Sequence, residues 1–310
     1  MEIAEQLLRS DPTDEFSDSK ATSHPLTSLT YASPEDSALK RLVIRSVEQI
    51  SGQPRLQKMY WDLLTRVDAG DASFFDGALQ RLGVDLVFDQ RVLDRVPHGG
   101  PLVVIANHPY GVLDGLAICG LVSRLRPRFK VLAHAALCRE PRLAEYFLPV
   151  DFDDTPEATH TNISTKRRAL VALRNSEALI IFPSGGVATS PRGLGTAIDL
   201  EWKLFAAKLV QQAQAPVLPM FFHGQNSRLF QLISQLSLTL RLAMLMHEVR
   251  NKMGEPLRVT IGETIPFDAI AGIQERKRLT EYLRAHVESL GASVQNLDEH
   301  EHVMCSRAGN

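Results

Sequence analysis

The segment IANHPYGVLDG, residues 105–115, places Asn107, His108 and Asp114 where an apolar run gives way to turn residues. A neutral imidazole can remove a proton from a hydroxyl or an amine, and a nearby carboxylate can hold the ring in the required tautomer. A helix is expected to begin near Val112, and the positive end of a helix dipole disfavours protonation of a histidine. We therefore expect a neutral imidazole near pH 7, with His108 as a general base and Asp114 as the acid that orients it.

A structural interpretation of the same pair stays open, with His108 as a turn residue and Asp114 as a helix cap. No serine or cysteine lies between the two residues. If the pair is catalytic, the nucleophile would therefore be a group of the substrate that gives its proton to His108.

Two further segments carry candidate binding groups, and each also follows an apolar run. In FPSGGVATS, Gly185 and Gly186 allow a substrate to approach the backbone, and turn N–H groups can bind an anion or a developing oxyanion. In HGQNSR, Asn226 either lines a pocket or belongs to the cap of the next helix. Arg192, in SPRG, is either a cation of the site or an exposed loop residue.

Short apolar runs, many of them β-branched, alternate with helical segments after residue 83. This alternation predicts an α/β fold with helices on the faces of a sheet. Ligands of such sheets bind outside the carboxyl ends of the strands, so the segments that carry His108 and Gly185 are expected to share one edge. The predicted strands are 84–88, 102–106, 129–133, 178–182, 216–222 and 257–262, and the predicted helices are 112–124, 164–175, 196–213, 228–250 and 274–290.

The residues before this alternating region have a different pattern. Three amphipathic helices are predicted at 33–52, 54–67 and 72–83, with glycines at the ends of the first and third. The expected organisation is a disordered tail at 1–36, an N-terminal helical segment at 37–83, an α/β domain at 84–290 and a polar C-terminal tail at 291–310.

Composition excludes several classes of protein. A formal net charge of −2 over 310 residues argues against a nucleic-acid partner, because nucleic-acid-binding proteins usually carry a basic excess. Cys119, Cys138 and Cys305 lack CxxC spacing, which argues against a disulfide framework or a zinc site and fits a reducing compartment. The acidic N-terminus does not resemble a secretory signal, and no run reaches the about 18 apolar residues of a membrane-spanning helix. We expect a cytoplasmic protein that is soluble or bound to one face of a membrane.

NHPYGVLDG, FPSGG and APVLPMFFHGQNS together resemble the motifs of the PlsC-like glycerolipid acyltransferase superfamily, over about residues 40–270. The sequence looks closest to the bacterial hemolysin-like or lysophospholipid acyltransferase-like branch, which includes enzymes that acylate ornithine- or glycine-containing aminolipids. The resemblance implies a mixed, largely parallel sheet flanked by helices. It also implies that His108 is the base on the acceptor, that Asp114 orients it, and that Asn107 is the asparagine of the motif, with a structural role.

Two departures from the superfamily pattern affect these expectations. Five residues separate His108 from Asp114 where the general motif has four, and Gly111 offers a looser turn that can absorb the extra residue. The family's FPEGTRS is FPSGGVA here, so Ser184 and Val187 replace the glutamate and arginine that the family links to binding glycerol phosphate. The replacement favours a lyso-aminolipid or another lyso-lipid as the acceptor, with Arg192 as a candidate substitute for the missing cation.

The resemblance implies transfer of a fatty acyl group from acyl-CoA or acyl carrier protein to the hydroxyl or amine of a lyso-lipid. No permanently bound cofactor and no metal are expected. The expected partners are the lyso-lipid, the acyl donor and the inner face of the cytoplasmic membrane. The expected catalytic residues are His108 and Asp114, and the expected substrate-binding residues are Asn107, Ser184, Gly185, Gly186, Arg192 and Asn226.

Two other functions stay open. A lipid or thioester hydrolase would use water activated by His108, or Ser184 as a nucleophile, although Phe182 occupies the first glycine position of a GxSxG elbow. A non-catalytic lipid-binding relative would keep the fold alone.

Segments outside the motifs also admit two interpretations each. The apolar segment 228–250 is either a core helix or a surface that enters the bilayer interface. The basic clusters at 124–130 and 166–168 either bind anionic groups of a lipid, coenzyme A or a carrier protein, or are solvated faces.

Overall fold

The computed structural model describes residues 53–68, 70, 73–134, 138, 143–151, 155–191, 193, 195–236 and 238–307. The predicted tail at 1–36 and the predicted helix at 33–52 lie outside these residues. Within the described part of the chain, none of the helices combines the length and hydropathy that crossing a bilayer requires.

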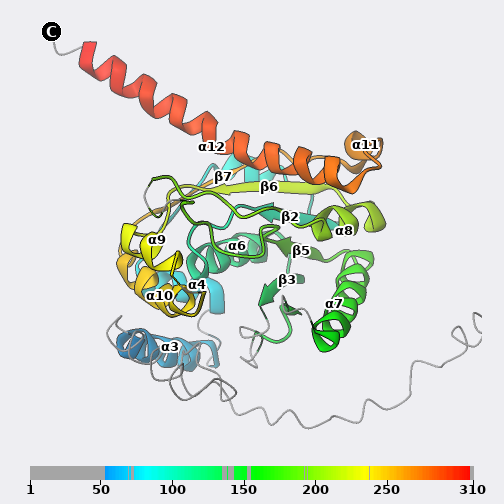
Figure 1. The fold of residues 1–310 in the computed structure, drawn as a ribbon, viewed down its shortest axis with the longest axis horizontal. Coiled ribbons are helices and arrows are strands. Elements are labelled where there is room, and N and C mark those ends of the chain that lie inside the picture. Colours follow the sequence, from blue (N-terminus) through cyan, green and yellow to red (C-terminus); the bar gives the residue numbers. More distant parts are fainter. Residues whose placement is uncertain are drawn as a thin grey trace, which may run out of the picture.

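A seven-stranded sheet forms the centre of the molecule, in the order β1-β7-β6-β2-β5-β3-β4 (Figure 1). The five strands from β6 to β4 pair in parallel, β7 is antiparallel to β6, and β1 is parallel to β7. The predicted mixed, largely parallel sheet is therefore confirmed. The strands are β1 Leu86–Val87, β2 Leu102–Ala106, β3 Phe129–His134, β4 Phe147–Val150, β5 Ala178–Ile181, β6 Val217–Phe222 and β7 Leu257–Ile261.

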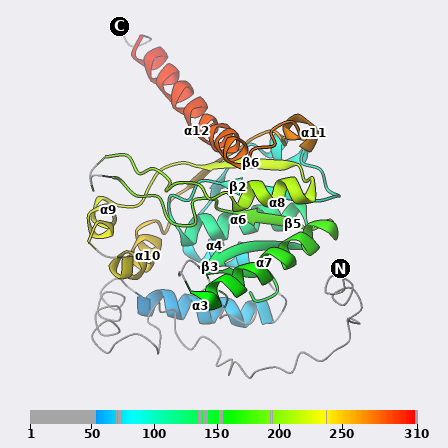
Figure 2. The ribbon, with the colours of Figure 1, turned by 45° about the vertical axis from the view of Figure 1, so that its right-hand side comes forward.

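Helices cover both faces of the sheet, and the apolar strands pack against both layers (Figure 2). One layer contains α4 and α6 and receives Leu102 and Val104 of β2, while the other contains α7, α8 and α12 and receives Val103 and Ile105. The helices are α3 Gln53–Asp68, α4 Phe74–Leu82, α5 Gln90–Asp94, α6 Val112–Leu125, α7 Pro156–Arg174, α8 Phe205–Ala213, α9 Arg228–Ser234, α10 Leu238–Asn251, α11 Phe267–Ile270 and α12 Arg276–Arg307.

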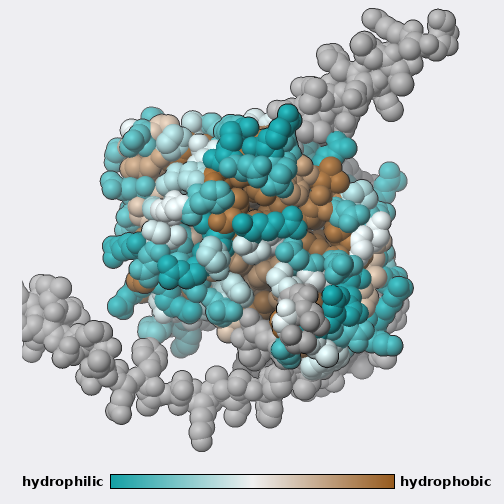
Figure 3. All heavy atoms as spheres, turned by 180° about the vertical axis from the view of Figure 1, so that it is seen from behind, coloured by the Kyte–Doolittle hydropathy of each residue, from teal (hydrophilic) through white to brown (hydrophobic). Residues whose placement is uncertain are grey.

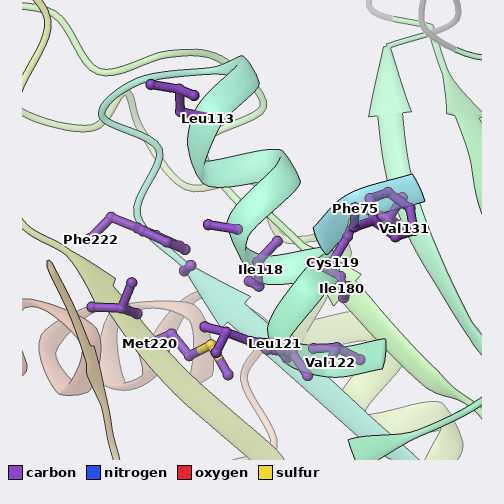
Figure 4. Close-up of a cluster of buried hydrophobic side chains, with 14 of the residues drawn as sticks. Phe75, Leu113, Ile118, Cys119, Leu121, Val122, Val131, Ile180, Met220 and Phe222 are labelled. Atoms are coloured by element: carbon purple, nitrogen blue, oxygen red, sulfur yellow. The ribbon is translucent and has the colours of Figure 1, made fainter. Parts of the chain in front are cut away.

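The strand that leads into His108 lies in the middle of the core. Every residue of β2 is buried, as expected for a central parallel strand with helices on both sides. Figure 4 shows the layer between α6 and the sheet, where Ile118 and Leu121 meet Met220 of β6. The end of β2 is thus fixed on both faces. On the face seen in Figure 3, hydrophilic side chains cover most of the surface and hydrophobic ones gather toward the middle.

The predicted elements agree with the observed ones at the centre of the fold and differ at its edges. Strand β4 and the short helices α5 and α11 were not predicted, because their runs are too short to show a period. The predicted helix at 228–250 is two helices, α9 and α10, and the predicted helix at 196–213 begins only at Phe205, after a loop. Helix α12 continues through residues predicted as a polar tail. The division of the chain into domains remains a prediction.

Candidate functional site

The Asn107 side chain connects the carboxyl end of β2 to the neighbouring strand β6 through two hydrogen bonds. Its side-chain Nδ2 donates to the carbonyl of Phe222 at 2.9 Å, and its Oδ1 accepts from the Phe222 N–H at 2.7 Å. The side chain thus occupies both backbone groups of Phe222 where the β2–β6 pairing ends. This pairing fixes the backbone from which His108 projects, which is a structural role for Asn107.

The structure brings His108 and Asp114 together across the five intervening residues. His108 Nδ1 lies 3.1 Å from Asp114 Oδ1. The Asp114 carboxylate is completely buried at the start of α6, where Oδ2 accepts from the Tyr110 N–H at 2.8 Å and Oδ1 from the Gly115 N–H at 2.9 Å. The carboxylate is therefore held from two sides and faces one ring nitrogen of His108. The histidine side chain is 16% exposed, and Nε2 is the ring atom that can meet a substrate.

Gly111 provides the turn that makes this contact possible. Its φ of 85° and ψ of −91° lie in a region that residues with a Cβ avoid. A Cβ at this position would also lie 2.9 Å from Val187 Cγ2 and 3.0 Å from Leu245 Cδ2. The extra residue between His108 and Asp114 is thus accommodated by a conformation and a packing space that both require glycine.

We expect Gly111→Ala to lower the free energy of unfolding by roughly 2 to 4 kcal/mol, since backbone strain and overpacking each cost about 1 to 3 kcal/mol. Urea denaturation measures this change. Gly115→Ala in α6 is the matched control, because no atom lies within 4 Å of its added Cβ and the backbone is helical. Equal stability of the two variants would contradict the assigned role of Gly111.

Two side chains from distant parts of the chain complete the surroundings of His108. The Phe182 ring, after β5, stacks on the imidazole with a centroid distance of 4.0 Å and an interplanar angle of 25°. Asp199 Oδ1 accepts from the His108 backbone N–H at 3.0 Å, and Asp199 Oδ2 accepts from Trp202 Nε1 at 3.0 Å. Asp199 was not predicted as a site residue, because residues 196–213 were expected to be a helix.

The two carboxylates determine the direction of the histidine pKa. Burial lowers the pKa of His108, but the charge and hydrogen bonding of Asp114, together with the charge of Asp199, raise it, and the net shift is above the ordinary value. The net shift is therefore opposite to the lowering that was expected from the helix dipole alone. Burial also raises the pKa of Asp199, against the hydrogen bonds from His108 and Trp202.

The FPSGG segment forms a tight turn beside the histidine. Ser184 is buried and its hydroxyl donates to the Gly186 carbonyl at 2.9 Å. Gly185 has a φ of 67°, and its N–H donates to the Phe182 carbonyl at 3.0 Å. The Ala188 N–H donates to the His108 carbonyl at 2.7 Å, which fixes the turn next to the motif. The buried Ser184 side chain is therefore part of the hydrogen bonding within the turn.

Asn226 lies on the other side of the motif, just before α9. The side chain is buried, and its Nδ2 lies 3.5 Å from the Tyr110 carbonyl. Its buried Oδ1 has no hydrogen-bond partner among the residues that the structure describes. Arg192, the other predicted substrate-binding residue, lies outside the described residues.

Comparison with known proteins places the chain among acyltransferases. A family model described as Acyltransferase matches residues 44–296. A lyso-glycine lipid O-acyltransferase of Bacteroides thetaiotaomicron is 26% identical over 237 residues, covering 68% of this chain and 81% of the relative. A protein of the same name from Phocaeicola vulgatus is 24% identical over 251 residues, covering 77% and 84%.

Among solved structures, the 1-acyl-sn-glycerophosphate (LPA) acyltransferase PlsC from Thermotoga maritima is similar, with 19% identity and a TM-score of 0.47 over 84% of this chain and 81% of that one. The family model spans most of the sequence and includes all the site residues described above. The resemblance found in the motifs is therefore confirmed, and the chain belongs to this family of acyltransferases.

Proposed function

We propose that this acyltransferase moves a fatty acyl group from an acyl thioester to the hydroxyl of a lyso-lipid at a membrane surface. The observation that carries the proposal is the 3.1 Å contact between His108 Nδ1 and the buried Asp114 carboxylate, within a family of acyltransferases. The two relatives are named for O-acylation of a lyso-glycine lipid, which favours a lyso-aminolipid of that class as the acceptor.

The site geometry supports a direct transfer with His108 as general base. Neutral His108 accepts the acceptor's hydroxyl proton at Nε2 while the oxygen attacks the thioester carbonyl. Asp114 stabilises the imidazolium that forms. The tetrahedral intermediate then expels the thiolate, which takes the proton from the imidazolium. One ester bond forms, one thioester bond breaks, and the protein returns to its starting state.

The turn at Gly185 and Gly186 is the candidate site for the developing oxyanion. Because the Gly185 N–H is already bonded to the Phe182 carbonyl, we assign the oxyanion contact to the Gly186 N–H. Ser184 donates its hydroxyl to the Gly186 carbonyl, which fixes the peptide that follows Gly186 and so holds the turn in shape. This assignment makes Ser184 a positioning residue and leaves the acceptor oxygen as the nucleophile.

The donor is an acyl thioester of coenzyme A or of an acyl carrier protein, and the proposed steps require no cofactor beyond these substrates. Cys119 and Cys138 are free thiols, which fits the proposed location on the cytoplasmic face of a membrane.

The function is tested by incubating the purified protein with a radiolabelled acyl thioester, with and without a lyso-glycine lipid. We expect labelled diacylated lipid and an equal amount of released thiol only when the acceptor is present. Release of free fatty acid without the acceptor would indicate a hydrolase, and neither product would indicate a non-catalytic relative; both results would contradict the proposal.

Asp199→Asn is expected to change the pH dependence of the reaction. The base must be unprotonated, so activity falls as the pH drops through the pKa of His108. The Asp199 charge raises that pKa, and its removal should move the acidic limb of the kcat/KM profile to lower pH. Loss of the positioned contacts should also reduce kcat, on the order of tenfold.

Trp202→Phe is the matched variant, because it removes the indole N–H that binds Asp199 and keeps the carboxylate. We expect a lower kcat with the acidic limb left near its native position. An acidic limb that moves equally in both variants, or in neither, would show that the Asp199 charge does not act on His108.

A further inference from the structure

Helix α9 exposes leucines on its outer side. Leu229 and Leu232, with Leu236 in the turn that follows, are 50%, 47% and 76% exposed. Their spacing places them on one side of the helix, while Phe230 and Gln231 are buried on another. The helix thus buries a glutamine and presents leucines to the surroundings.

The loop before α8 adds a second set of exposed apolar side chains. Together the two segments hold six of the ten large hydrophobic side chains that are exposed in the described part of the chain. Such a concentration differs from the scattered apolar residues of an ordinary surface. We call these six residues the apolar rim: Ile198, Leu200, Leu204, Leu229, Leu232 and Leu236.

Three hydrogen bonds, one of them buried and two partly buried, join the two segments and fix the orientation of α9. Gln231 Oε1 accepts from the Ser190 N–H at 2.7 Å, and Gln235 Nε2 donates to the Ser190 carbonyl at 2.9 Å. Gln225 Oε1, just before α9, accepts from the Ala197 N–H at 2.7 Å. Turning the leucines inward would break these bonds, so the exposure of the leucines is part of the fold.

The apolar rim borders the His108 site. Asp199, which accepts from the His108 N–H, lies between Ile198 and Leu200 in the chain. Leu200 Cδ1 lies 3.0 Å from the position of a Cβ on Gly186, so it packs directly on the proposed oxyanion turn. Helix α9 lies at the outer edge of the molecule, far from α7, in both Figure 1 and Figure 2.

We propose that the apolar rim docks this protein onto a lipid bilayer, so that a lyso-lipid reaches His108 directly from the membrane. The proposal rests on the lipid acceptor of the proposed function and adds the surface that meets the lipid. Leucines at an interface gain by leaving water. The exposed Arg228 and Lys203 lie in the same segments and can contact anionic headgroups. They balance Glu201 and Asp199, so no net negative charge opposes contact with a lipid surface. A second copy of the chain is the alternative occupant.

The triple variant Leu229→Gln, Leu232→Gln and Leu236→Gln tests the surface. Binding is measured by co-sedimentation with phosphatidylcholine vesicles, with and without phosphatidylglycerol. We expect the variant to bind at least about tenfold more weakly than the native protein. Its acyl transfer to a lyso-lipid embedded in vesicles should fall in parallel, while transfer to a water-soluble short-chain acceptor should be unchanged.

A control variant lies on α7. Ile163 and Val171 are 57% and 52% exposed, so Ile163→Gln with Val171→Gln replaces two exposed apolar side chains away from the rim. This variant should bind vesicles and acylate embedded acceptors like the native protein. Circular dichroism and thermal unfolding establish that both variants are folded.

Several outcomes would overturn the proposal. Unchanged vesicle binding of the triple variant would do so, as would an equal loss in the α7 control. A native dimer that the triple variant converts to a monomer, with vesicle binding unchanged, would assign the rim to a second copy. Vesicle binding is measured without any acyl transfer, so a native protein that binds through the rim and acylates no lyso-lipid would contradict the proposed function alone.

Discussion

Replacing His108 with alanine should lower kcat/KM for acyl transfer by about 10²–10⁴-fold, the usual contribution of a positioned general base. The imidazole is the group placed to accept the proton, with Asp114 on one ring nitrogen and Phe182 stacked on its face. The loss should appear mainly in kcat, because the proton moves in the transition state and not in the bound ground state.

The matched control for this prediction is His98→Ala, which removes an exposed histidine from a turn outside the site. Both variants should unfold at temperatures within a few degrees of the native protein, as judged by circular dichroism. Initial rates are measured from labelled lipid product at several acceptor concentrations. A His108→Ala protein that is folded and keeps a rate close to the native one would rule out the base.

Asp114→Asn should reduce kcat to a similar extent, on the order of 10²–10⁴-fold, by analogy with the orienting carboxylate of a catalytic triad. The native carboxylate receives the Tyr110 and Gly115 N–H groups and faces His108. An amide has only one oxygen, so its NH₂ group must face a donor or the ring. The substitution therefore disturbs the tautomer of His108 and leaves a buried donor without its partner.

The same substitution should lower the free energy of unfolding by about 1 to 3 kcal/mol, the usual penalty for a buried polar group left unpaired. Urea denaturation measures this penalty separately from the kinetics. Asp94→Asn, which changes an exposed carboxylate that accepts from Gln90, should alter neither quantity. If Asp114→Asn lost stability but kept its kcat, Asp114 would be a structural residue alone.

The centre of the fold and of the site could be predicted from the sequence because its signals are local. The apolar run of β2 is bounded by a proline and by Asn107, and the observed strand is Leu102–Ala106, as expected. The motif from His108 to Asp114 lies within one strand-to-helix connection, so its residues stay close in space whatever the rest of the chain does. Gly111 was recognised as the place where an extra residue could be absorbed, and its positive φ agrees.

The remaining features depend on contacts between distant segments. Asp199 is 91 residues from His108 in the chain, and only the packing of the loop before α8 against the turn after β2 brings them together. The same loop adds the charge of Asp199 to the larger effect of Asp114, and together they raise the pKa of His108, where the helix dipole alone was expected to lower it. Ser184 was assigned to substrate binding, whereas its hydroxyl is bonded to the Gly186 carbonyl inside the turn.

The break between α9 and α10 could not be predicted from the composition of the segment. The segment 228–250 is rich in apolar residues with only scattered polar ones, so periodicity could not separate a continuous helix from two helices with different surroundings. The polar residues within it, Gln231 and Gln235, are the ones that bond to the neighbouring loop. Their partner, Ser190, is 41 residues from the first of them.

The pH dependence of kcat/KM for acylation of a lyso-glycine lipid tests the proposed base most directly. We expect a single acidic limb with its midpoint above about 6.5, the ordinary histidine value, because Asp114 and Asp199 raise the pKa of His108. In the His108→Ala protein the residual rate should not show this limb. A native profile that is flat across this range, or an acidic limb that persists unchanged after His108 is removed, would contradict it.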